Sequence, residues 1–211
     1  MRLYGYRNGR TLRALWALEE VAAEYDYTEV DVMSGEARQP WFLKINPAAK
    51  VPVLVDDGAV ITESAAVCMR LAEKYPHAGL LPAIATPQRS QCYQWISFIL
   101  TELDAPLWTV AKHRFALPTE RRVPAVVDTA IWEFGMAASL LATRLTEPEY
   151  LVGGCFTVAD ILAAHTLLWA RSARIGYQDA RLERYLETLL ARDSVARAKQ
   201  RAALSSNRVT E

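Results

Sequence analysis

The chain has 211 residues, of which 52% are hydrophobic and 23% charged, enough for one large domain or two small ones with a substantial core. Its 24 basic and 24 acidic side chains balance to a formal net charge of +0, which argues against a nucleic-acid binder that works by neutralising phosphates. Three scattered cysteines, Cys68, Cys92 and Cys155, predict neither a disulfide framework nor a zinc site.

The start of the sequence runs directly into a strand-like pattern and shows no signal-peptide pattern. No apolar run in the sequence suggests a segment that spans a bilayer. We therefore expect a cytoplasmic protein that binds neither nucleic acid nor a membrane.

The first part of the chain alternates between strand and helix patterns. In order, the expected elements are a strand at 3–6, a helix capped by Thr11, a strand at 28–32, a short helix at 39–45, two short strands around the turn at 57–58, and a helix from Ser64. This order predicts a compact α/β layer, although periodicity alone does not determine the order of the strands.

The composition changes after residue 77. Residues 78–87 are rich in proline and glycine, which indicates a linker, and the chain beyond them shows almost only helical patterns. A core helix through Cys92 is expected to kink or to end near Asp104, because Pro106 follows. Further helices are expected at 124–145, from Thr157, at 181–192 and at 194–204, with Thr157 and Asp160 forming a capping box. The predicted domains are 1–77 and 88–211.

The stretch from Asn46 to Ser64 carries the strongest functional signal. Pro52 lacks an N–H and cannot lie in a paired central strand, and a proline at this place can follow a cis bond. Val51 would then keep its backbone groups available for a peptide-like ligand. The helix start at Ser64 favours a carboxylate, and Glu63 beside it favours an ammonium group. An amine and a carboxylate joined to a peptide backbone describe the γ-glutamyl end of glutathione.

These residues resemble the cytosolic glutathione transferase family, in its bacterial type. The matching motifs are Asn46-Pro47, the run 50–54, Asp57-Gly58, the run 61–64 and, far downstream, the run 156–160. The resemblance covers nearly the whole chain. It implies a thioredoxin-like N-terminal domain, an all-helical bundle as C-terminal domain, glutathione as co-substrate without a metal, and a homodimer. In such a dimer, apolar surface on the helices that carry Cys68 and Cys92 would have to be covered.

The resemblance also implies how glutathione is held. Ser64 would donate to the γ-glutamyl carboxylate, Glu63 would meet the ammonium group, and Val51, fixed by Pro52, would pair with the cysteinyl unit through its backbone. Lys50 would meet the glycyl carboxylate. Ala49 departs from the pattern, because relatives often have a glycine before this lysine, and the departure should affect the freedom of the loop.

The thiol of glutathione must be activated, because a free thiol has a pKa of about 8.5 and reacts as its thiolate. A donor near the start of the first helix would stabilise the thiolate. Many bacterial relatives have Ser or Cys at this point, whereas the ungapped register places Gly9 or Arg10 there. The remaining candidates are Tyr6, Asn8, Arg10 and Thr11, with Tyr4 as a further hydroxyl and Arg13 expected to make a local salt bridge.

The electrophile pocket is expected in the first helical segments of the second domain. Its candidate residues are Leu103, Trp108, Lys112, His113 and Arg114. Alternatively, Trp108 packs in the core, and His113 and Arg114 lie on a solvated surface.

The sequence therefore predicts a detoxifying glutathione S-transferase that attacks a small hydrophobic electrophile, by conjugation, reduction or dehalogenation. One alternative is a glutathione-dependent isomerase of an unsaturated diacid, which basic pocket residues would favour. The other is a non-catalytic relative that binds glutathione or a partner protein, and Gly9 keeps this alternative open.

Overall fold

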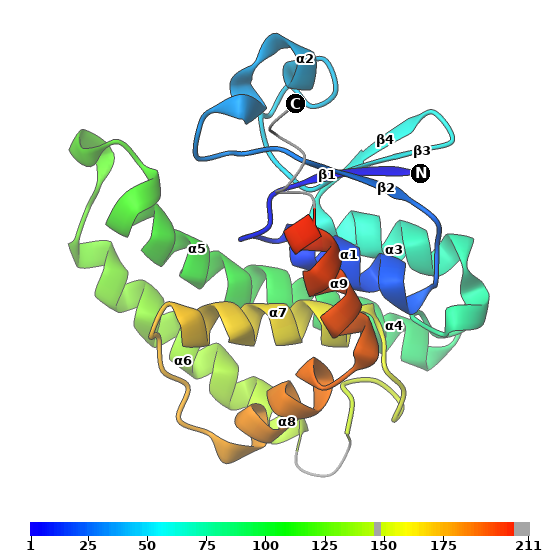
Figure 1. Ribbon diagram of the computed structural model, residues 1–211. Coiled ribbons are helices and arrows are strands. Elements are labelled where there is room, and N and C mark those ends of the chain that lie inside the picture. Colours follow the sequence, from blue (N-terminus) through cyan, green and yellow to red (C-terminus); the bar gives the residue numbers. More distant parts are fainter. Residues whose placement is uncertain (146–148, 205–211) are drawn as a thin grey trace. The chain divides into compact units, whose positions relative to one another are not determined.

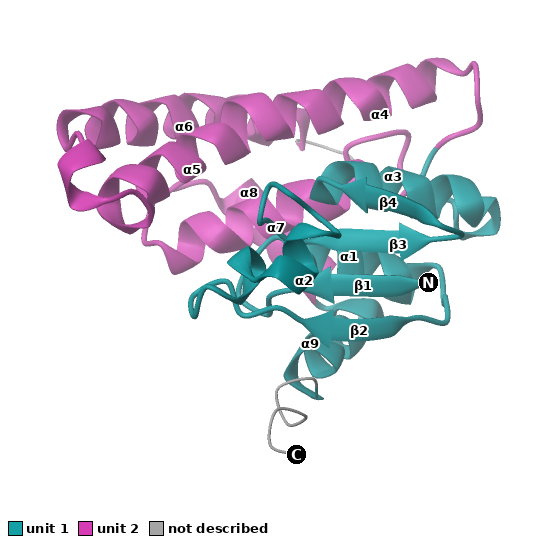
Figure 2. Ribbon diagram, turned by 90° about the horizontal axis from the view of Figure 1, so that it is seen from above, with its two compact units in different colours: residues 1–81, 191–211 teal, residues 82–190 magenta. Residues whose placement is uncertain are grey.

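The structure is a computed structural model that describes residues 1–145 and 149–204. The chain divides into two compact units, one comprising residues 1–81 and 191–211 and the other residues 82–190 (Figure 2). Below they are called unit 1 and unit 2.

Unit 1 is a four-stranded sheet with helices on both faces. Its elements are β1 (Arg2–Gly5), α1 (Thr11–Glu20), β2 (Asp26–Glu29), a 3₁₀ turn (Glu36–Arg38), α2 (Pro40–Leu43), β3 (Val53–Asp56), β4 (Ala59–Thr62), α3 (Ser64–Lys74), a second 3₁₀ turn (Pro76–Ala78) and α9 (Asp193–Leu204). The strand order is β2-β1-β3-β4, with β1 parallel to β2 and the other neighbouring pairs antiparallel. The predicted α/β layer is confirmed.

Strand β2 begins and ends earlier in the sequence than the predicted strand at 28–32. Its partner β1 ends at Gly5, which pairs with Glu29, so the ladder stops there. The Val30 N–H still donates to the Gly5 carbonyl at 2.7 Å, after which the chain leaves the sheet. Val30 and Val32 pack into the core beside α2 instead of extending the strand. The alternating pattern therefore predicted correctly that Val30 and Val32 pack into the core, but it predicted strand pairing beyond Glu29 that the structure does not have.

The two faces of the sheet are covered by different helices. Helices α1 and α3 lie on one face and α2 on the other (Figure 1). On the α2 side, Phe42 and Val53 belong to a buried cluster, and Tyr4 packs against it with its ring edge-on to Phe42 at 6.1 Å. Tyr4 therefore serves the packing of α2.

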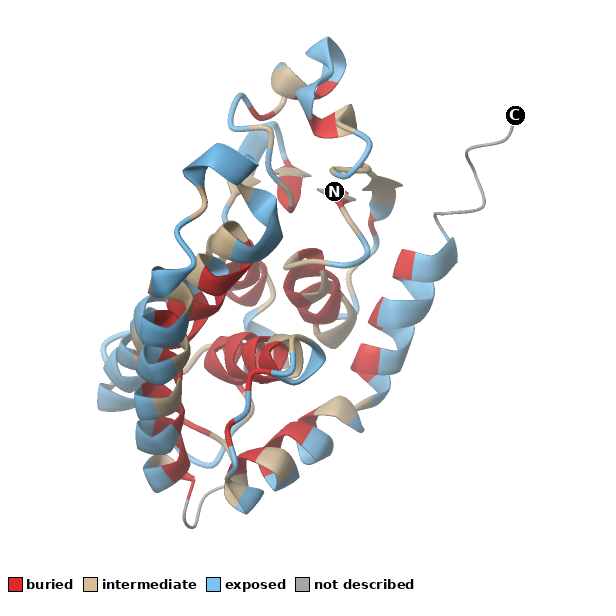
Figure 3. Cartoon of the chain, turned by 90° about the vertical axis from the view of Figure 1, so that its left-hand side faces the viewer, coloured by how far each residue is buried: buried red, intermediate tan, exposed pale blue. Residues whose placement is uncertain are grey.

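Helix α9 belongs to unit 1, although it follows the whole of unit 2 in the sequence. Arg192, just before α9, donates to both carboxylate oxygens of Glu20 at 2.7 and 2.9 Å, and Ser194 donates to Glu20 at 2.6 Å. Buried alanines and a valine follow one side of α9 (Figure 3). The predicted domain 88–211 placed this helix with the others, whereas its contacts with α1 group it with the sheet.

Unit 2 is all-helical. Its elements are α4 (Pro87–Phe98), a π-helical segment (Ile99–Asp104), α5 (Ala105–Ala111), a second π-helical segment (Lys112–Ala116), a 3₁₀ turn (Thr119–Arg121), α6 (Ala125–Arg144), α7 (Val158–Ser172) and α8 (Ala180–Leu190). Of the two expectations for this place, a kink and a helix end, the end near Asp104 is wrong, because helical turns continue through α5. The wider turn of the π-helical segment next to Pro106 accommodates a residue without an N–H, so the helix continues through it.

The start of α7 is closed by its own side chains. Thr157 and Asp160 form the predicted capping box, and both are fully buried. Asp160 also accepts hydrogen bonds from the Leu151 N–H at 2.9 Å and from the Tyr185 hydroxyl at 2.7 Å. Burial raises the pKa of Asp160 above its ordinary value, although these donors oppose the rise. The motif at 156–160 is therefore structural, as the sequence indicates.

Helix α6 carries a stripe of exposed apolar side chains. Trp132, Met136 and Leu140 recur at every fourth residue and are 65%, 53% and 57% exposed. By length and composition alone this helix could cross a membrane, with 33% of its most apolar window buried, so the expectation that no apolar run suffices is not met. The same test is passed by helices of soluble proteins. Among described residues of α4, by contrast, the exposed side chains are mostly polar, apart from Tyr93.

Candidate functional site

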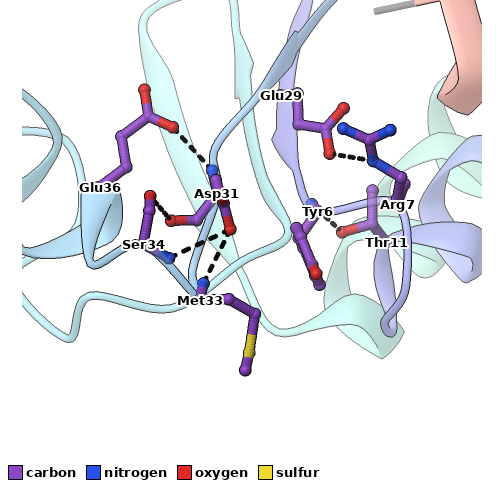
Figure 4. Close-up of polar contacts among 8 residues, drawn as sticks. All are labelled: Tyr6, Arg7, Thr11, Glu29, Asp31, Met33, Ser34 and Glu36. Carbon is purple, nitrogen blue, oxygen red and sulfur yellow. Dashed lines mark hydrogen bonds and ion pairs between the residues drawn. The ribbon is translucent and has the colours of Figure 1, made fainter. Parts of the chain in front are cut away.

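Because β1 and β2 are parallel, the loops that follow them leave the sheet at the same edge (Figure 4). The first loop joins β1 to α1 and contains the predicted thiol partners. The second leads from β2 towards α2. Both belong to unit 1, and together they form one rim of the candidate site.

The start of α1 is locked onto the end of β1. The Thr11 side chain is fully buried, and its oxygen accepts a hydrogen bond from the Tyr6 N–H at 2.9 Å. A Cβ atom on Gly5 would lie 2.1 Å from the Thr11 Cγ2, so only glycine fits there. Thr11 is the first residue of the helix and does not cap it, because the N-cap position is occupied by Arg10. The predicted cap is wrong, and the hydroxyl joins strand to helix instead.

The other predicted thiol partners lie on the accessible part of this loop. Tyr6 and Arg10 are half-buried, and Asn8 is exposed. The Tyr6 side chain and the exposed Met33 side chain extend to the same side of the two loops (Figure 4). The structure therefore brings these three candidates into one loop and sets the buried Thr11 behind them.

An ion pair that the sequence did not indicate fixes this loop to β2. The Arg7 Nε lies 2.6 Å from the Glu29 Oε1, and the Glu29 side chain is only 8% exposed. The second loop is held by Asp31, whose side chain accepts hydrogen bonds from the N–H groups of Met33 and Ser34. Glu36 closes the same turn by accepting from the Asp31 N–H at 2.7 Å. Both loops of this rim are therefore anchored by carboxylates.

The segment before β3 has the geometry that the sequence suggested. The Val51–Pro52 peptide bond is cis, and β3 begins only at Val53. In the part of the chain that the structure describes, no protein hydrogen bond reaches the backbone of Val51. The buried Asn46 side chain holds the preceding turn, donating to the Lys50 carbonyl at 2.8 Å and accepting from the Ala48 N–H at 3.1 Å.

Ala49 in that turn has a positive φ of 54°. An L-residue pays about 1–2 kcal/mol in this region and glycine does not, which is the physical reason why a glycine suits the position. Lys50 beside it is exposed. The departure at Ala49 therefore costs stability in the loop and leaves Lys50 accessible.

Glu63 and Ser64 begin α3 in an unusual way. Glu63 is exposed and held at φ 66° and ψ 117°, and it makes no side-chain cap. Such a conformation costs a non-glycine residue of the order of 1–3 kcal/mol and is concentrated at ligand sites. Ser64 is the first helical residue and is 5% exposed. The first intrahelical bond is made by the Val67 N–H, so the N–H groups before it point out of the helix end.

Arg13 is a residue of this region whose role sequence reasoning missed. It lies in α1 with no exposed surface, and its Nη1 donates to the Ser64 Oγ at 3.3 Å. The partners are separated by 51 residues, so no local pattern points to the contact. A charged residue among the buried positions of an amphipathic helix was the only signal available.

None of the cysteines forms a disulfide, and two are unsuited to act as nucleophiles. Burial raises the pKa of Cys68 to about 12 and also raises that of Cys92. Cys155 is exposed in the turn before α7. Among the described residues, no group of three or more His, Cys, Asp or Glu side chains could hold a metal ion.

The predicted electrophile residues all lie in unit 2 but differ in their surroundings. Leu103 is fully buried, Trp108 and Arg114 are exposed, and Lys112 is half-buried. The His113 Nδ1 accepts a hydrogen bond from the Val123 N–H at 3.0 Å, which ties the end of the long helix to the segment before α6. Leu103 therefore belongs to the core, whereas Trp108, Lys112 and Arg114 keep surface that could meet a ligand.

Comparisons with known proteins agree on one family. The model of the glutathione S-transferase N-terminal domain matches residues 1–73, and that of the C-terminal domain matches residues 106–193. Glutathione S-transferase F10 of Arabidopsis thaliana is 31% identical over 155 residues, 71% of this chain and 71% of the relative. A probable maleylacetoacetate isomerase of Caenorhabditis elegans is 32% identical over 160 residues, 75% of this chain and 73% of the relative.

Solved structures agree with these matches. A sphingomonad glutathione S-transferase complexed with glutathione aligns with a TM-score of 0.83 at 26% identity, over 97% of this chain and 100% of that chain. The predicted architecture, a thioredoxin-like domain followed by an all-helical one, is confirmed by this alignment and by the order of the two family domains.

Proposed function

Since the chain belongs to the glutathione S-transferase family, we propose that it binds glutathione at unit 1 and ionises its thiol for attack on a small hydrophobic electrophile. The observation that carries the proposal is the start of α3, where Glu63 is held at positive φ and the helix end has no side-chain cap. A bound carboxylate would accept hydrogen bonds from the uncapped N–H groups beside this strained residue.

Each part of glutathione has a proposed partner. The γ-glutamyl carboxylate accepts from the Ser64 N–H and hydroxyl, and its ammonium group meets the exposed Glu63 carboxylate. The cysteinyl backbone pairs with Val51, whose backbone lies outside the β3 ladder after the cis bond. Lys50 meets the glycyl carboxylate. These partners are all in unit 1.

The thiol is activated by a donor from the loop between β1 and α1. Tyr6, Asn8 and Arg10 are the stronger candidates, because Thr11 is buried and its oxygen is engaged by the Tyr6 N–H. Lowering the thiol pKa by two units requires about 2.7 kcal/mol of preferential stabilisation of the thiolate, which one hydrogen bond to a charged group can supply.

In the reaction, the thiolate sulfur donates its electron pair to an electrophilic carbon and a new S–C bond forms. The leaving group departs with its bonding electrons or, in an addition, the electrons move to an adjacent atom that takes a proton. Trp108, Lys112 and Arg114 are proposed to contact the electrophile, and the reaction needs no metal.

The alternative isomerase function is favoured by the relative named as a probable maleylacetoacetate isomerase. There the thiolate would add to a double bond of an unsaturated diacid and later be eliminated, so glutathione would be regenerated. Measuring glutathione consumption separates the two reactions. A non-catalytic relative, which Gly9 keeps open, would bind glutathione and consume none.

The experiment that tests the proposal is an ultraviolet titration of the thiolate of bound glutathione in the wild type and in Tyr6→Phe, Asn8→Ala and Arg10→Met. We expect ionisation near neutral pH in the wild type and a raised thiol pKa in one variant. If glutathione does not bind, both the transferase and the isomerase are excluded. If it binds without ionising, the protein is a non-catalytic binder.

We also propose a homodimer, in which the exposed stripe of Trp132, Met136 and Leu140 on α6 is covered by the second copy. Stripes of this kind mark interaction surfaces. Trp132→Asp should convert a dimer to a monomer in sedimentation analysis, and Ile84→Asp, at another exposed apolar residue, should leave it unchanged. The free cysteines suit a reducing cytoplasm, where we place a detoxifying role.

A further inference from the structure

Glu29 is a buried carboxylate with a hydrogen-bond partner for only one of its two oxygens. Its side chain is 8% exposed, and its Oε1 lies 2.6 Å from the Arg7 Nε. Its Oε2 is buried and has no partner among residues 1–145 and 149–204. The Tyr27 hydroxyl, two residues earlier on the same face of β2, is buried and equally without a partner in this part of the chain. Unpaired polar groups destabilise a folded interior, so the stability of unit 1 does not explain them.

The ion pair with Arg7 does not offset this cost. The Arg7 side chain is 43% exposed, and ion pairs with exposed partners contribute little to stability. Apolar side chains at positions 27 and 29 would avoid the unpaired groups. Buried polar groups that do not stabilise the fold require another explanation, and the place of Arg7 in the chain supplies one.

The contact between Arg7 and Glu29 fixes the loop that carries the proposed thiol partners. Glu29 is the last paired residue of β2 and lies opposite Gly5, the last residue of β1. The next two residues after β1 are both tethered. The Tyr6 N–H donates to the Thr11 Oγ1 at 2.9 Å, and the Arg7 side chain donates to Glu29. The loop between β1 and α1 therefore begins with two adjacent fixed points.

The second of these tethers determines the side to which Tyr6 points. Tyr6 and Arg7 are neighbours in the chain, and their side chains leave the loop in opposite directions (Figure 4). Because Glu29 holds Arg7 on one side, the Tyr6 ring lies on the other, where the Met33 side chain also lies. A donor stabilises a thiolate most when it is held in place before the charge develops.

We infer that Glu29 is a positioning residue for thiol activation and acts through Arg7. The ion pair holds the loop so that the Tyr6 hydroxyl, on the opposite side of the loop, meets the sulfur of bound glutathione. This inference rests on the proposed function, because it concerns the same reaction. It adds a carboxylate and a guanidinium that act on the thiol without touching it.

Two measurements on the full-length protein test this role. The first is the ultraviolet titration of bound glutathione, which gives the thiol pKa. The second is the affinity for γ-glutamyl-alanyl-glycine, in which a hydrogen atom replaces the thiol group of glutathione. In Arg7→Met and in Glu29→Gln, the thiol pKa should rise by about one unit, a tenfold fall in the ratio of thiolate to thiol. The affinity for the tripeptide without sulfur should stay the same.

The direction of the two pKa changes separates positioning from a direct effect of charge. Arg7→Met removes a cation and Glu29→Gln removes an anion, so direct charge effects would raise the thiol pKa in the first variant and lower it in the second. Loss of position raises it in both. The double variant should be no worse than either single variant, because the two residues act as a pair. Arg7→Lys, which keeps the charge, should recover part of the loss.

Arg2→Met is the matched control. Arg2 and Asp26 also form an ion pair between β1 and β2, at the opposite end of the same ladder and away from the loop. Breaking that ion pair should change neither the thiol pKa nor the affinity for the tripeptide without sulfur. A rise of the thiol pKa in Arg2→Met as large as that in Arg7→Met would overturn the inference.

Other outcomes also overturn the inference. One is a thiol pKa that falls in Glu29→Gln or is unchanged in both variants. Another is a loss of affinity for the tripeptide without sulfur in both, which indicates a purely structural role. If bound glutathione does not ionise near neutral pH in the wild type, the proposed activation itself is wrong. Should Glu29→Gln fail to fold, Arg7→Met is combined with Tyr6→Phe. There it should raise the thiol pKa no further, and additive rises would contradict the inference.

Discussion

Helices α3 and α7 use their first turns in opposite ways. At the start of α7, Thr157 and Asp160 are fully buried, and the Asp160 carboxylate accepts from the Thr157 N–H at 2.8 Å. At the start of α3, Glu63 is exposed at positive φ and caps nothing. The first arrangement completes its hydrogen bonds internally, which stabilises the fold. The second has no side-chain cap, and we propose that a ligand completes it while the folded chain carries the strain.

The largest expected effect comes from removing the hydrogen bonds that Asp160 accepts at the start of α7. Asp160→Ala removes the acceptor for Leu151, Thr157 and Tyr185 and leaves buried donors unpaired, so the free energy of unfolding should fall by about 3–5 kcal/mol. Urea unfolding measures the loss, with Tyr185→Phe as a control that removes one hydrogen bond. A loss no larger than that of the control would contradict the view of Asp160 as the centre of this network.

The next effect concerns the C-terminal part of α3, where Arg70 and Lys74 form ion pairs with the buried Asp56. Burial alone would raise the pKa of Asp56, but hydrogen bonds from Lys74 and Arg70 outweigh it and hold the pKa below its ordinary value. Asp56→Asn should cost about 2 kcal/mol of unfolding free energy at neutral pH, since a buried carboxylate loses both cationic partners.

The pH dependence of that cost follows from the lowered pKa. The stabilisation by Asp56 is complete above the carboxyl pKa of the unfolded chain, about 4, and is lost as the pH falls through the lower folded pKa. The difference between wild type and Asp56→Asn should therefore be constant near neutral pH and shrink in acid. If the difference in unfolding free energy grows on acidification, the pKa of Asp56 is raised in the folded protein and not lowered.

Smaller effects are expected from matched substitutions at the starts of α3 and α7, which compare the two helix starts directly. Ser64→Ala should weaken glutathione binding about tenfold and lower the unfolding free energy by about 1 kcal/mol, because the buried Arg13 loses one hydrogen bond. Thr157→Ala, the matched change at α7, should cost about 1–2 kcal/mol of stability and leave the glutathione affinity unchanged. Calorimetric titration and urea unfolding of both variants check the pair, and similar profiles for the two would remove the distinction.

The smallest effect concerns the strain at Glu63. Glycine adopts its φ of 66° freely, so Glu63→Gly should raise the unfolding free energy by about 0.5–1 kcal/mol, after allowing for the greater entropy of the unfolded chain. Glu63→Ala keeps the strain and should not be stabilised. Both variants should bind glutathione more weakly, because the proposed ammonium partner is gone. A Glu63→Gly variant no more stable than Glu63→Ala would indicate that the backbone there is relaxed.

Features set by neighbouring residues could be predicted from the sequence. The capping box at Thr157 and the cis bond before Pro52 follow from two to four adjacent residues, and both are found. The strand at 28–32 was misplaced, because its end depends on where β1 stops. The sequence leaves open whether the helix kinks or ends at Pro106, because proline is compatible with both, and in the structure the helix continues beside a π-helical segment.

For the candidate site, the sequence predicted the likeness of the Asn46–Ser64 stretch to a family. It did not predict the contacts between segments that are distant in the chain. Arg13 reaches Ser64 across 51 residues, and Arg7 reaches Glu29 across 22. The buried role of Thr11 depends on the absence of a side chain at Gly5, which only the packed structure displays.

The hydrogen bonds between Glu20 and the residues that open α9 also bear on how the protein is made. Glu20 leaves the ribosome well before Arg192 and Ser194, which follow it by 172 and 174 residues. Domains generally fold as they emerge, the N-terminal one first. Here unit 1 lacks α9 until the whole of unit 2 has been synthesised, so the side of α1 that receives α9 stays uncovered until then.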